Sequence, residues 1–113
     1  MSLPVQTISA DFCVAPQLLP EAMAQAAAAG FRSVINNRPD FEGGPDQPSS
    51  ADMAAAAQAA GLAYQHLPVN GSYQSPEEIA QFRQLLDQLP KPILAFCRSG
   101  ARSTRLFNAA SLL

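Results

Sequence analysis

The sequence predicts an α/β fold with a mainly parallel central sheet of four or five strands flanked by helices. Short apolar or β-branched segments alternate with helix-favouring ones along the chain, which is typical of this class. One segment, residues 93–96, is wholly apolar, as expected for a strand buried at the centre of a parallel sheet. The chain has 113 residues, 48% of them hydrophobic and 14% charged, which suits one folded domain over residues 1–113.

The first half of the chain predicts two strands and two helices in alternation. β-branched and apolar residues favour the strands, while alanine-rich stretches favour the helices. A loop with three prolines and two glycines precedes the second helix, and a loop this long in a compact domain is often functional. In order, the elements are a strand over 11–15, a helix over 21–29 ending at Gly30, a strand over 33–36, the loop over 37–50, and a helix from Ser49 or Ser50 to Gly61.

The second half contains the clearest helix start in the chain. Ser75 supplies an N-cap, Pro76 suits the first helical position, and Glu78 can complete a capping box. Apolar residues then recur at helical spacing. In order, the elements are a strand over 62–69, a turn over 70–73, the helix from residue 76, the buried strand over 93–96 and a last helix over 103–113.

Composition argues against several functions. The net charge is -2 and Lys and Arg form no run, so no nucleic-acid partner is expected. No apolar stretch approaches the length of a membrane span and no secretory signal is visible, so the chain is expected in the cytoplasm. One histidine and two distant cysteines predict no metal site, and no cofactor is expected. The chain stops about three turns into its last predicted helix, and we therefore expect a trimmed chain or a domain cut from a larger protein.

The functional prediction depends on Cys97. The buried strand leads directly into this cysteine, Gly100 permits a tight turn after it, and Ser103 opens a helix. The thiol is therefore expected at the carboxyl end of a central strand, where open α/β sheets bind ligands. With no signal for export, a reactive or core thiol is favoured over a structural disulfide.

The residues after Cys97 predict an anion-binding cradle. Backbone N–H groups and the positive end of the helix attract an anion, and Arg102 adds a fixed fork of donors. The same groups favour thiolate over thiol, and the Ser103 hydroxyl is expected to donate a hydrogen bond to the sulfur. Cys97, Arg102 and Ser103 are thus the predicted catalytic residues. The anion is also expected to contact Arg98, Ser99, Gly100 and Ala101.

This loop resembles the active sites of two families, the rhodanese sulfurtransferases and the cysteine phosphatases. Over roughly residues 5–110, the chain is more similar still to the beta-lactamase hydrolase-like protein family, in its phosphatase-like domain. The shared features are the segments 34–40, 59–64, 66–69 and 97–103. The resemblance implies a dual-specificity-phosphatase-like fold and places Gln17 and Arg38 near the cradle, although Arg38 could instead hold its own loop through Asp40. Family members occur fused to persulfide dioxygenase or sulfide–quinone reductase domains, which implies such partners here.

Two features favour sulfur over phosphorus chemistry. Four residues separate Cys97 from Arg102, as in rhodaneses, whereas cysteine phosphatases place one more between them. A phosphatase normally protonates its leaving group with an aspartate. The resemblance places that acid in the loop 70–74, which contains no carboxylate, so Asp40 is the remaining candidate acid. We therefore expect a sulfurtransferase that takes sulfane sulfur from thiosulfate or a low-molecular-weight persulfide and passes it through a Cys97 persulfide to a thiol.

Two other functions stay open. One is hydrolysis of a phosphoester through a Cys97 phosphocysteine. The other is a non-catalytic module that binds anions or senses oxidation at Cys97. Cys13 could resolve an oxidised Cys97, although a packed strand cysteine is the commoner case. His66 is expected to be a structural, hydrogen-bonded residue, and Met23 and Met53 are expected to fill the core.

Overall fold

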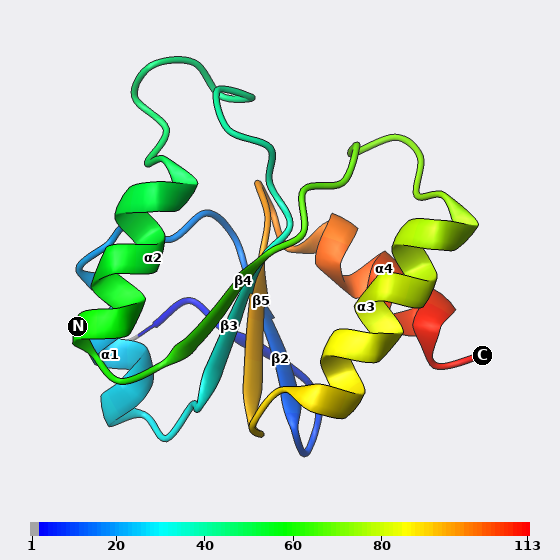
Figure 1. The fold of residues 1–113 in the computed structure, drawn as a ribbon, viewed down its shortest axis with the longest axis horizontal. Coiled ribbons are helices and arrows are strands. Elements are labelled where there is room, and N and C mark those ends of the chain that lie inside the picture. Colours follow the sequence, from blue (N-terminus) through cyan, green and yellow to red (C-terminus); the bar gives the residue numbers. More distant parts are fainter. Residues whose placement is uncertain (1–2) are drawn as a thin grey trace.

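Five strands form one mixed sheet in the order β1-β2-β5-β3-β4, over residues 3–113 that this computed structural model describes (Figure 1). The four strands from β2 onward are parallel, and β1 pairs antiparallel with β2 at one edge. The sequence-based prediction of a mainly parallel α/β sheet is therefore confirmed. The strands are β1 (Gln6–Ser9), β2 (Phe12–Ala15), β3 (Ser33–Asn36), β4 (Ala63–His66) and β5 (Ile93–Phe96).

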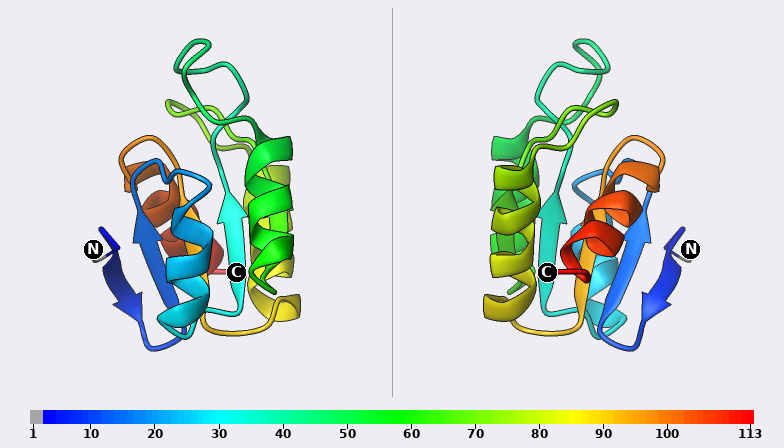
Figure 2. Two further views of the ribbon diagram at one scale, coloured as in Figure 1. Left: turned by 90° about the vertical axis from the view of Figure 1, so that its left-hand side faces the viewer. Right: turned by 90° about the vertical axis from the view of Figure 1, so that its right-hand side faces the viewer.

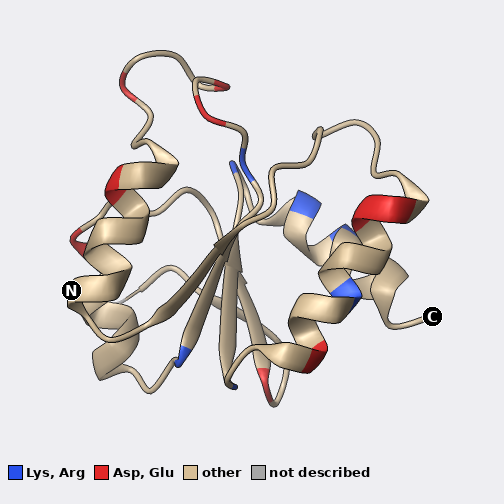
Figure 3. Cartoon of the chain, in the orientation of Figure 1, with Lys and Arg blue, Asp and Glu red and all other residues tan. Residues whose placement is uncertain are grey.

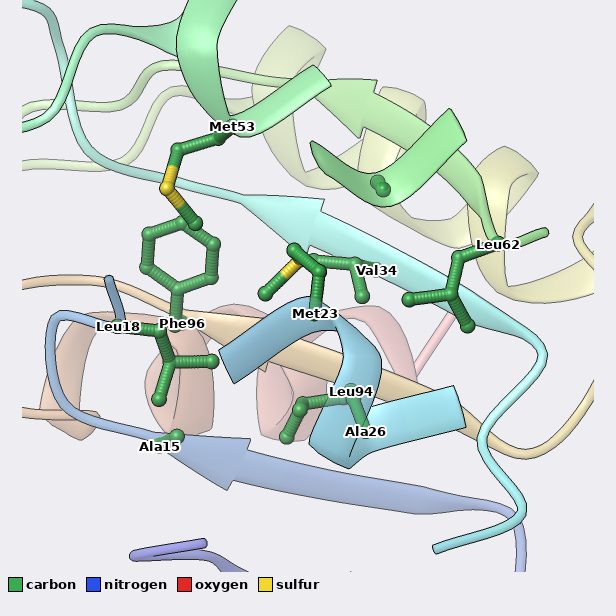
Figure 4. Packing of buried hydrophobic residues seen from close by; sticks show 10 residues of the cluster. Ala15, Leu18, Met23, Ala26, Val34, Met53, Leu62, Leu94 and Phe96 are labelled. Carbon is green, nitrogen blue, oxygen red and sulfur yellow. The ribbon is translucent and has the colours of Figure 1, made fainter. Parts of the chain in front are cut away.

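Helices cover both faces of the sheet (Figure 1). α1 and α2 bury Met23 and Met53 against one face, together with Phe96 from β5 (Figure 4). α3 and α4 bury Phe82 and Leu106 against the other face. Both methionines are 0% exposed, so the prediction that they fill the core is confirmed. The helices are α1 (Ala22–Ala28), α2 (Ser50–Ala59), α3 (Pro76–Gln88) and α4 (Ala101–Ala110). Within the described chain, none of them combines the length and apolar character needed to cross a bilayer.

Three elements differ from the sequence-based prediction. β1 was not predicted, because its side chains are exposed or half-buried and Gln-Thr-Ile-Ser has no strong apolar alternation. β4 is shorter than the predicted strand over 62–69, although the N–H groups of Leu67 and Val69 still donate to the carbonyls of Asn36 and Asn37. α4 begins at Ala101 rather than Ser103, because Gly100 adopts a left-handed conformation (φ 94°) and caps the helix there.

The carboxyl ends of the central strands meet at one edge of the sheet. Asn36, His66 and Phe96 lie in register as the last residues of β3, β4 and β5. The loops that follow these strands, residues 37–49 and 67–75 among them, project beyond that edge (Figures 1 and 2). Segments far apart in the sequence are therefore brought together where the sequence predicts ligand binding.

The capping box of α3 gives a stability prediction. The Ser75 hydroxyl accepts a hydrogen bond from the Glu78 N–H at 3.1 Å, and the Glu78 carboxylate accepts one from the Ser75 N–H at 2.9 Å. We expect Ser75→Ala to lower the free energy of unfolding by about 1 kcal/mol. Urea denaturation checks this, with Gln84→Ala on the exposed face of the same helix as control. Equal effects of the two substitutions would contradict a role for the cap.

Candidate active site

Cys97 lies directly after β5, in a tight loop that leads into α4. The side chain is only 1% exposed, and its sulfur accepts a hydrogen bond from the Gly100 N–H at 3.0 Å. The positive φ of Gly100 allows the loop to curl back over the sulfur, which a residue with a side chain would resist. The expected juxtaposition of thiol, tight turn and helix N-terminus is present.

The pKa of the Cys97 thiol is lowered from its ordinary value of 9.0. Burial raises this pKa, but hydrogen bonds from Ser103, Ser99 and Gly100 to the sulfur outweigh that effect. The Ser103 hydroxyl has a single proton, and in the structure it is donated to Asn37 Oδ1 at 2.8 Å rather than reserved for the sulfur. The hydroxyl is therefore shared between the sulfur and Asn37, and the backbone N–H groups of Ser103, Ser99 and Gly100 add to the support of the thiolate. The expected hydrogen bond from the Ser103 hydroxyl to the sulfur thus competes with the one to Asn37.

Arg102 is buried beside the cradle with most of its guanidinium occupied. Its two terminal nitrogens pair with both carboxylate oxygens of Glu42 at 3.0–3.1 Å. Nη1 also donates to the carbonyls of Asn37 and Val69. Nε is buried and has no partner among the described residues. A buried, unpaired N–H is costly to leave unsatisfied, which makes this atom the exception among the donors of the guanidinium.

Arg38 is fixed in the same cluster. Its Nε donates to Glu42 at 2.9 Å and its Nη1 donates to Gln17 Oε1 at 3.1 Å. The His66 ring nitrogen Nε2 is 2.8 Å from the Arg38 carbonyl, which agrees with a structural histidine. The alternative prediction, in which Arg38 holds its own loop through Asp40, was wrong. The carboxylate that pairs with Arg38 in this loop is Glu42. Asp40 instead accepts a hydrogen bond from the Ser50 N–H at 2.8 Å, near the start of α2.

A cavity of about 630 Å³ lies between the loops after β3, β4 and β5. Three arginines and a single carboxylate are among its lining residues, so it attracts anions although the whole chain carries a net charge of -2. Figure 3 shows basic positions gathered at the carboxyl ends of β3 and β5 and at the start of α4. The lining residues are Arg38, Glu42, Gly43, Asn70, Gly71, Ser72, Arg98 and Arg102.

The structure brings most of the predicted site residues together. Ser99, Gly100 and Ser103 donate hydrogen bonds to the Cys97 sulfur, while the Ala101 N–H donates to the Ser99 hydroxyl. Arg38, Arg98 and Arg102 line the cavity, and Gln17 contacts Arg38. Cys97 is buried and is not itself one of the lining residues. Asp40, the candidate acid, does not line the cavity. Cys13 is in register with Leu94, three residues before Cys97, which places the two cysteines about 10 Å apart along the sheet and argues against a resolving role.

Two residues of the site were missed from the sequence. Glu42 bridges Arg38 and Arg102, and Asn37 receives the Ser103 hydroxyl. The only signal for Glu42 was its i, i+4 spacing from Arg38. This spacing predicts an ion pair on a helix but not in a loop. Asn37 gave no signal, because its partner lies 66 residues away in the sequence.

The Glu42 ion pairs predict a pH-dependent stability. Burial raises the pKa of this carboxyl, but Arg102 and Arg38 outweigh burial and hold it below its ordinary value of 4.5. A lowered folded-state pKa means that the stabilisation is present above pH 4.5 and is lost as the pH falls through that lower pKa. We expect Glu42→Gln to be less stable than wild type at pH 7, and the difference to shrink below pH 4.5 in urea denaturation. Asp87→Asn, which removes an exposed ion pair to Arg83, is the control and should show a smaller difference. A Glu42→Gln difference that does not change with pH would contradict this assignment.

Fold and site together define a cysteine-phosphatase-like α/β protein. The chain belongs to the family described as "Beta-lactamase hydrolase-like protein, phosphatase-like domain", which matches residues 4–112. It is 38% identical over 81 residues to the beta-lactamase hydrolase-like protein of Agrobacterium fabrum and 37% identical over 87 residues to that of Xylella fastidiosa. These alignments cover 72% and 77% of this chain but only 19% and 20% of the two relatives.

Solved structures agree on the fold. A phosphatase candidate from Neisseria meningitidis has a TM-score of 0.86 and 31% identity, with 94% of this chain and 75% of that one covered. A phosphatase candidate of the DUF442 group from Shewanella putrefaciens has a TM-score of 0.82 at 20% identity, covering 98% and 69%. Tk-PTP in its active form has a TM-score of 0.71 at 17% identity, covering 98% and 82%. The latter two likenesses concern the fold alone.

Proposed function

We propose that this domain is a cysteine-dependent phosphatase in which Cys97 is the nucleophile. The observation that carries the proposal is a buried thiol with a lowered pKa in the same loop as Arg102, whose buried Nε has no partner among the described residues. Membership of a phosphatase-like family and likeness to phosphatase candidates support phosphorus as the reacting centre. This reverses the preference for sulfur that the sequence alone suggested.

In the proposed reaction the Cys97 thiolate attacks phosphorus. An S–P bond forms as the bond from phosphorus to the leaving oxygen breaks, and the electron pair departs with that oxygen. Backbone N–H groups of the loop and the free edge of Arg102 stabilise the negative charge on the phosphoryl oxygens. Water then attacks phosphorus, the S–P bond breaks, and inorganic phosphate and the thiolate are released.

Sulfur transfer is the second candidate, and the spacing of the loop favours it. Four residues between Cys97 and Arg102 match the rhodanese pattern, and the loop 70–74 contains no carboxylate to protonate an alkoxide. Here Cys97 would take a sulfur atom from an anionic donor and pass the persulfide sulfur to a thiol acceptor. Association with persulfide dioxygenase or sulfide–quinone reductase domains, and residence in the cytoplasm, remain predictions.

Intact-mass measurement separates the two candidates. Wild type and Cys97→Ser are mixed with para-nitrophenyl phosphate, and separately with thiosulfate or glutathione persulfide, and are then quenched. We expect a phosphoryl adduct on wild type and hydrolysis of the ester, with neither in the variant. A thiol-removable gain of one sulfur atom without ester hydrolysis would overturn the phosphatase proposal in favour of sulfur transfer. No adduct with any reagent would favour an anion-binding module.

A further inference from the structure

We propose that the substrate is a phosphoanhydride, with the reacting phosphoryl group carried on a second phosphate that Arg98 binds as the leaving group. The inference rests on the proposed phosphatase function and names its substrate class. Two observations carry it. Among the described residues that line the cavity, no side chain is placed to protonate a leaving oxygen, and there are more guanidinium groups than one phosphoryl group needs.

The first observation concerns the acids near the site. Glu42 is the only carboxylate among the residues lining the cavity, and both of its oxygens are in ion pairs with arginines. Such a carboxylate is held ionised and has no proton to donate. Asp40 is engaged with the Ser50 N–H, and His66 is engaged with the Arg38 carbonyl. Ser72, the only hydroxyl side chain in the lining, is too weak an acid to serve.

The absence of a placed acid limits which oxygen can leave. An alkoxide is about as basic as hydroxide, whose conjugate acid water has a pKa of about 15.7, so it needs a proton as it departs. A phosphate leaves as a stable anion, since its second pKa is about 6. Without a proton donor, thiolate attack is therefore fast only for groups that depart as weakly basic anions. Among these are phosphates, carboxylates and activated phenols.

The second observation selects phosphate from that set. Arg38 and Arg102 share the single carboxylate of Glu42, and the unpaired Nε of Arg102 is left for the reacting phosphoryl group. The Arg98 side chain is exposed at the cavity wall and makes no hydrogen bond or ion pair with any of residues 3–113. Its backbone is nevertheless fixed, because the Gln17 N–H donates to the Arg98 carbonyl at 3.2 Å. A guanidinium without a carboxylate partner, on a fixed backbone, suits a second phosphate.

The size of the cavity agrees with a second group. A volume of about 630 Å³ lies within the roughly 300–1,000 Å³ typical of small-molecule sites, which leaves room for more than one phosphate group. Arg105 lies at the same side, where its Nη2 bonds the Gly71 carbonyl. A leaving phosphate held by Arg98 would therefore lie in the positive potential of Arg98 and Arg105 rather than in bulk water.

The reaction balances without an external acid. The Cys97 thiolate forms an S–P bond to the terminal phosphorus, and the bridging P–O bond breaks. The electron pair goes to the bridging oxygen, which departs as part of the second phosphate with its charge held by Arg98. Water then attacks the phosphocysteine, the S–P bond breaks, and the electron pair returns to the sulfur. The proton of the water goes to the departing inorganic phosphate or to solvent.

The test compares kcat/KM for ADP, acetyl phosphate, β-glycerophosphate and a series of aryl phosphates of graded leaving-group pKa, in the presence of a chelator. We expect kcat/KM for ADP to exceed that for β-glycerophosphate by at least about 100-fold, because ADP releases a weakly basic phosphate whereas β-glycerophosphate must release an alkoxide without help from a general acid. We also expect the aryl series to fall steeply as the leaving-group pKa rises. Equal kcat/KM for ADP and β-glycerophosphate, or a kcat/KM for the aryl phosphates that does not depend on leaving-group pKa, would overturn the inference that no side chain protonates the leaving group.

Arg98 is tested by a ratio of two activities. In Arg98→Ala we expect kcat/KM to fall for both ADP and acetyl phosphate, but about 10- to 100-fold further for ADP, with partial recovery in Arg98→Lys. Arg83→Ala, on α3, is the control and should leave the ratio unchanged. An unchanged ratio in Arg98→Ala would overturn the second phosphate site even if the aryl series is steep. If no substrate yields phosphate or a phosphocysteine, the proposed phosphatase function itself fails and this inference fails with it.

Discussion

Replacing Cys97 by serine is expected to lower phosphatase activity by roughly 10⁴-fold or more, the scale seen when a covalent nucleophile is removed. The serine hydroxyl can occupy the place of the thiol, since both are small, but it stays protonated near neutral pH. The hydrogen bonds that lower the pKa of Cys97 therefore have no anion to stabilise. Initial rates with para-nitrophenyl phosphate check the prediction, and Cys13→Ser is the matched control, expected to retain near wild-type activity. A Cys97→Ser variant within about 10-fold of wild type would exclude covalent catalysis through this residue.

The same thiolate gives a pH profile. Because the pKa of Cys97 is lowered from 9.0, the rate of its alkylation by iodoacetamide is expected to rise with pH and to level off at a pH below that value. Ser103→Ala should move the inflection upward only slightly, since the hydroxyl proton is shared with Asn37 and the backbone N–H groups remain. This readout needs no substrate, so it also applies if the reaction is sulfur transfer. A large upward shift in Ser103→Ala would show that the hydroxyl, and not the backbone, dominates.

The parts of the site that could be predicted from sequence are local in the chain. The apolar strand 93–96 identifies the centre of the sheet, and Cys97 and Arg102 follow it within six residues. Because a strand end, a glycine turn and a helix N-terminus follow one another directly here, neighbouring residues determine the backbone around Cys97, and this could be predicted. The capping box at Ser75 was predictable for the same reason.

The parts that could not be predicted depend on distant contacts. Glu42 reaches Arg102 across 60 residues, and nothing in the composition of its loop indicates that it turns toward the cradle. The Asn37 side chain accepts a hydrogen bond from the Ser103 hydroxyl across a similar separation in the sequence. β1 is specified mainly by the open edge of β2 that it covers, rather than by its own sequence. In each case the tertiary fold, and not local propensity, selects the partner.

Substituting Arg102 by lysine is the second large effect that we expect. Lysine keeps the positive charge, but its single ammonium cannot pair with both Glu42 oxygens and also present a separate N–H to an anion. We expect kcat/KM to fall about 10²- to 10³-fold, the range for loss of a donor to a developing oxyanion, and phosphate to bind more weakly in calorimetry. The buried carbonyls of Asn37 and Val69 also lose their fixed donor, so thermal stability should fall.

The control for Arg102 is Arg83→Lys, because Arg83 also pairs with a carboxylate but lies on α3 outside the cavity lining. It should leave both kcat/KM and phosphate affinity unchanged. Glu42→Gln provides the complementary variant, since it leaves the guanidinium in place but removes the charge that orients it. If Arg102 binds the anion directly, Arg102→Lys should lose more phosphate affinity than Glu42→Gln does. The opposite order would mean that Glu42, rather than the fork of Arg102, determines the geometry of the site.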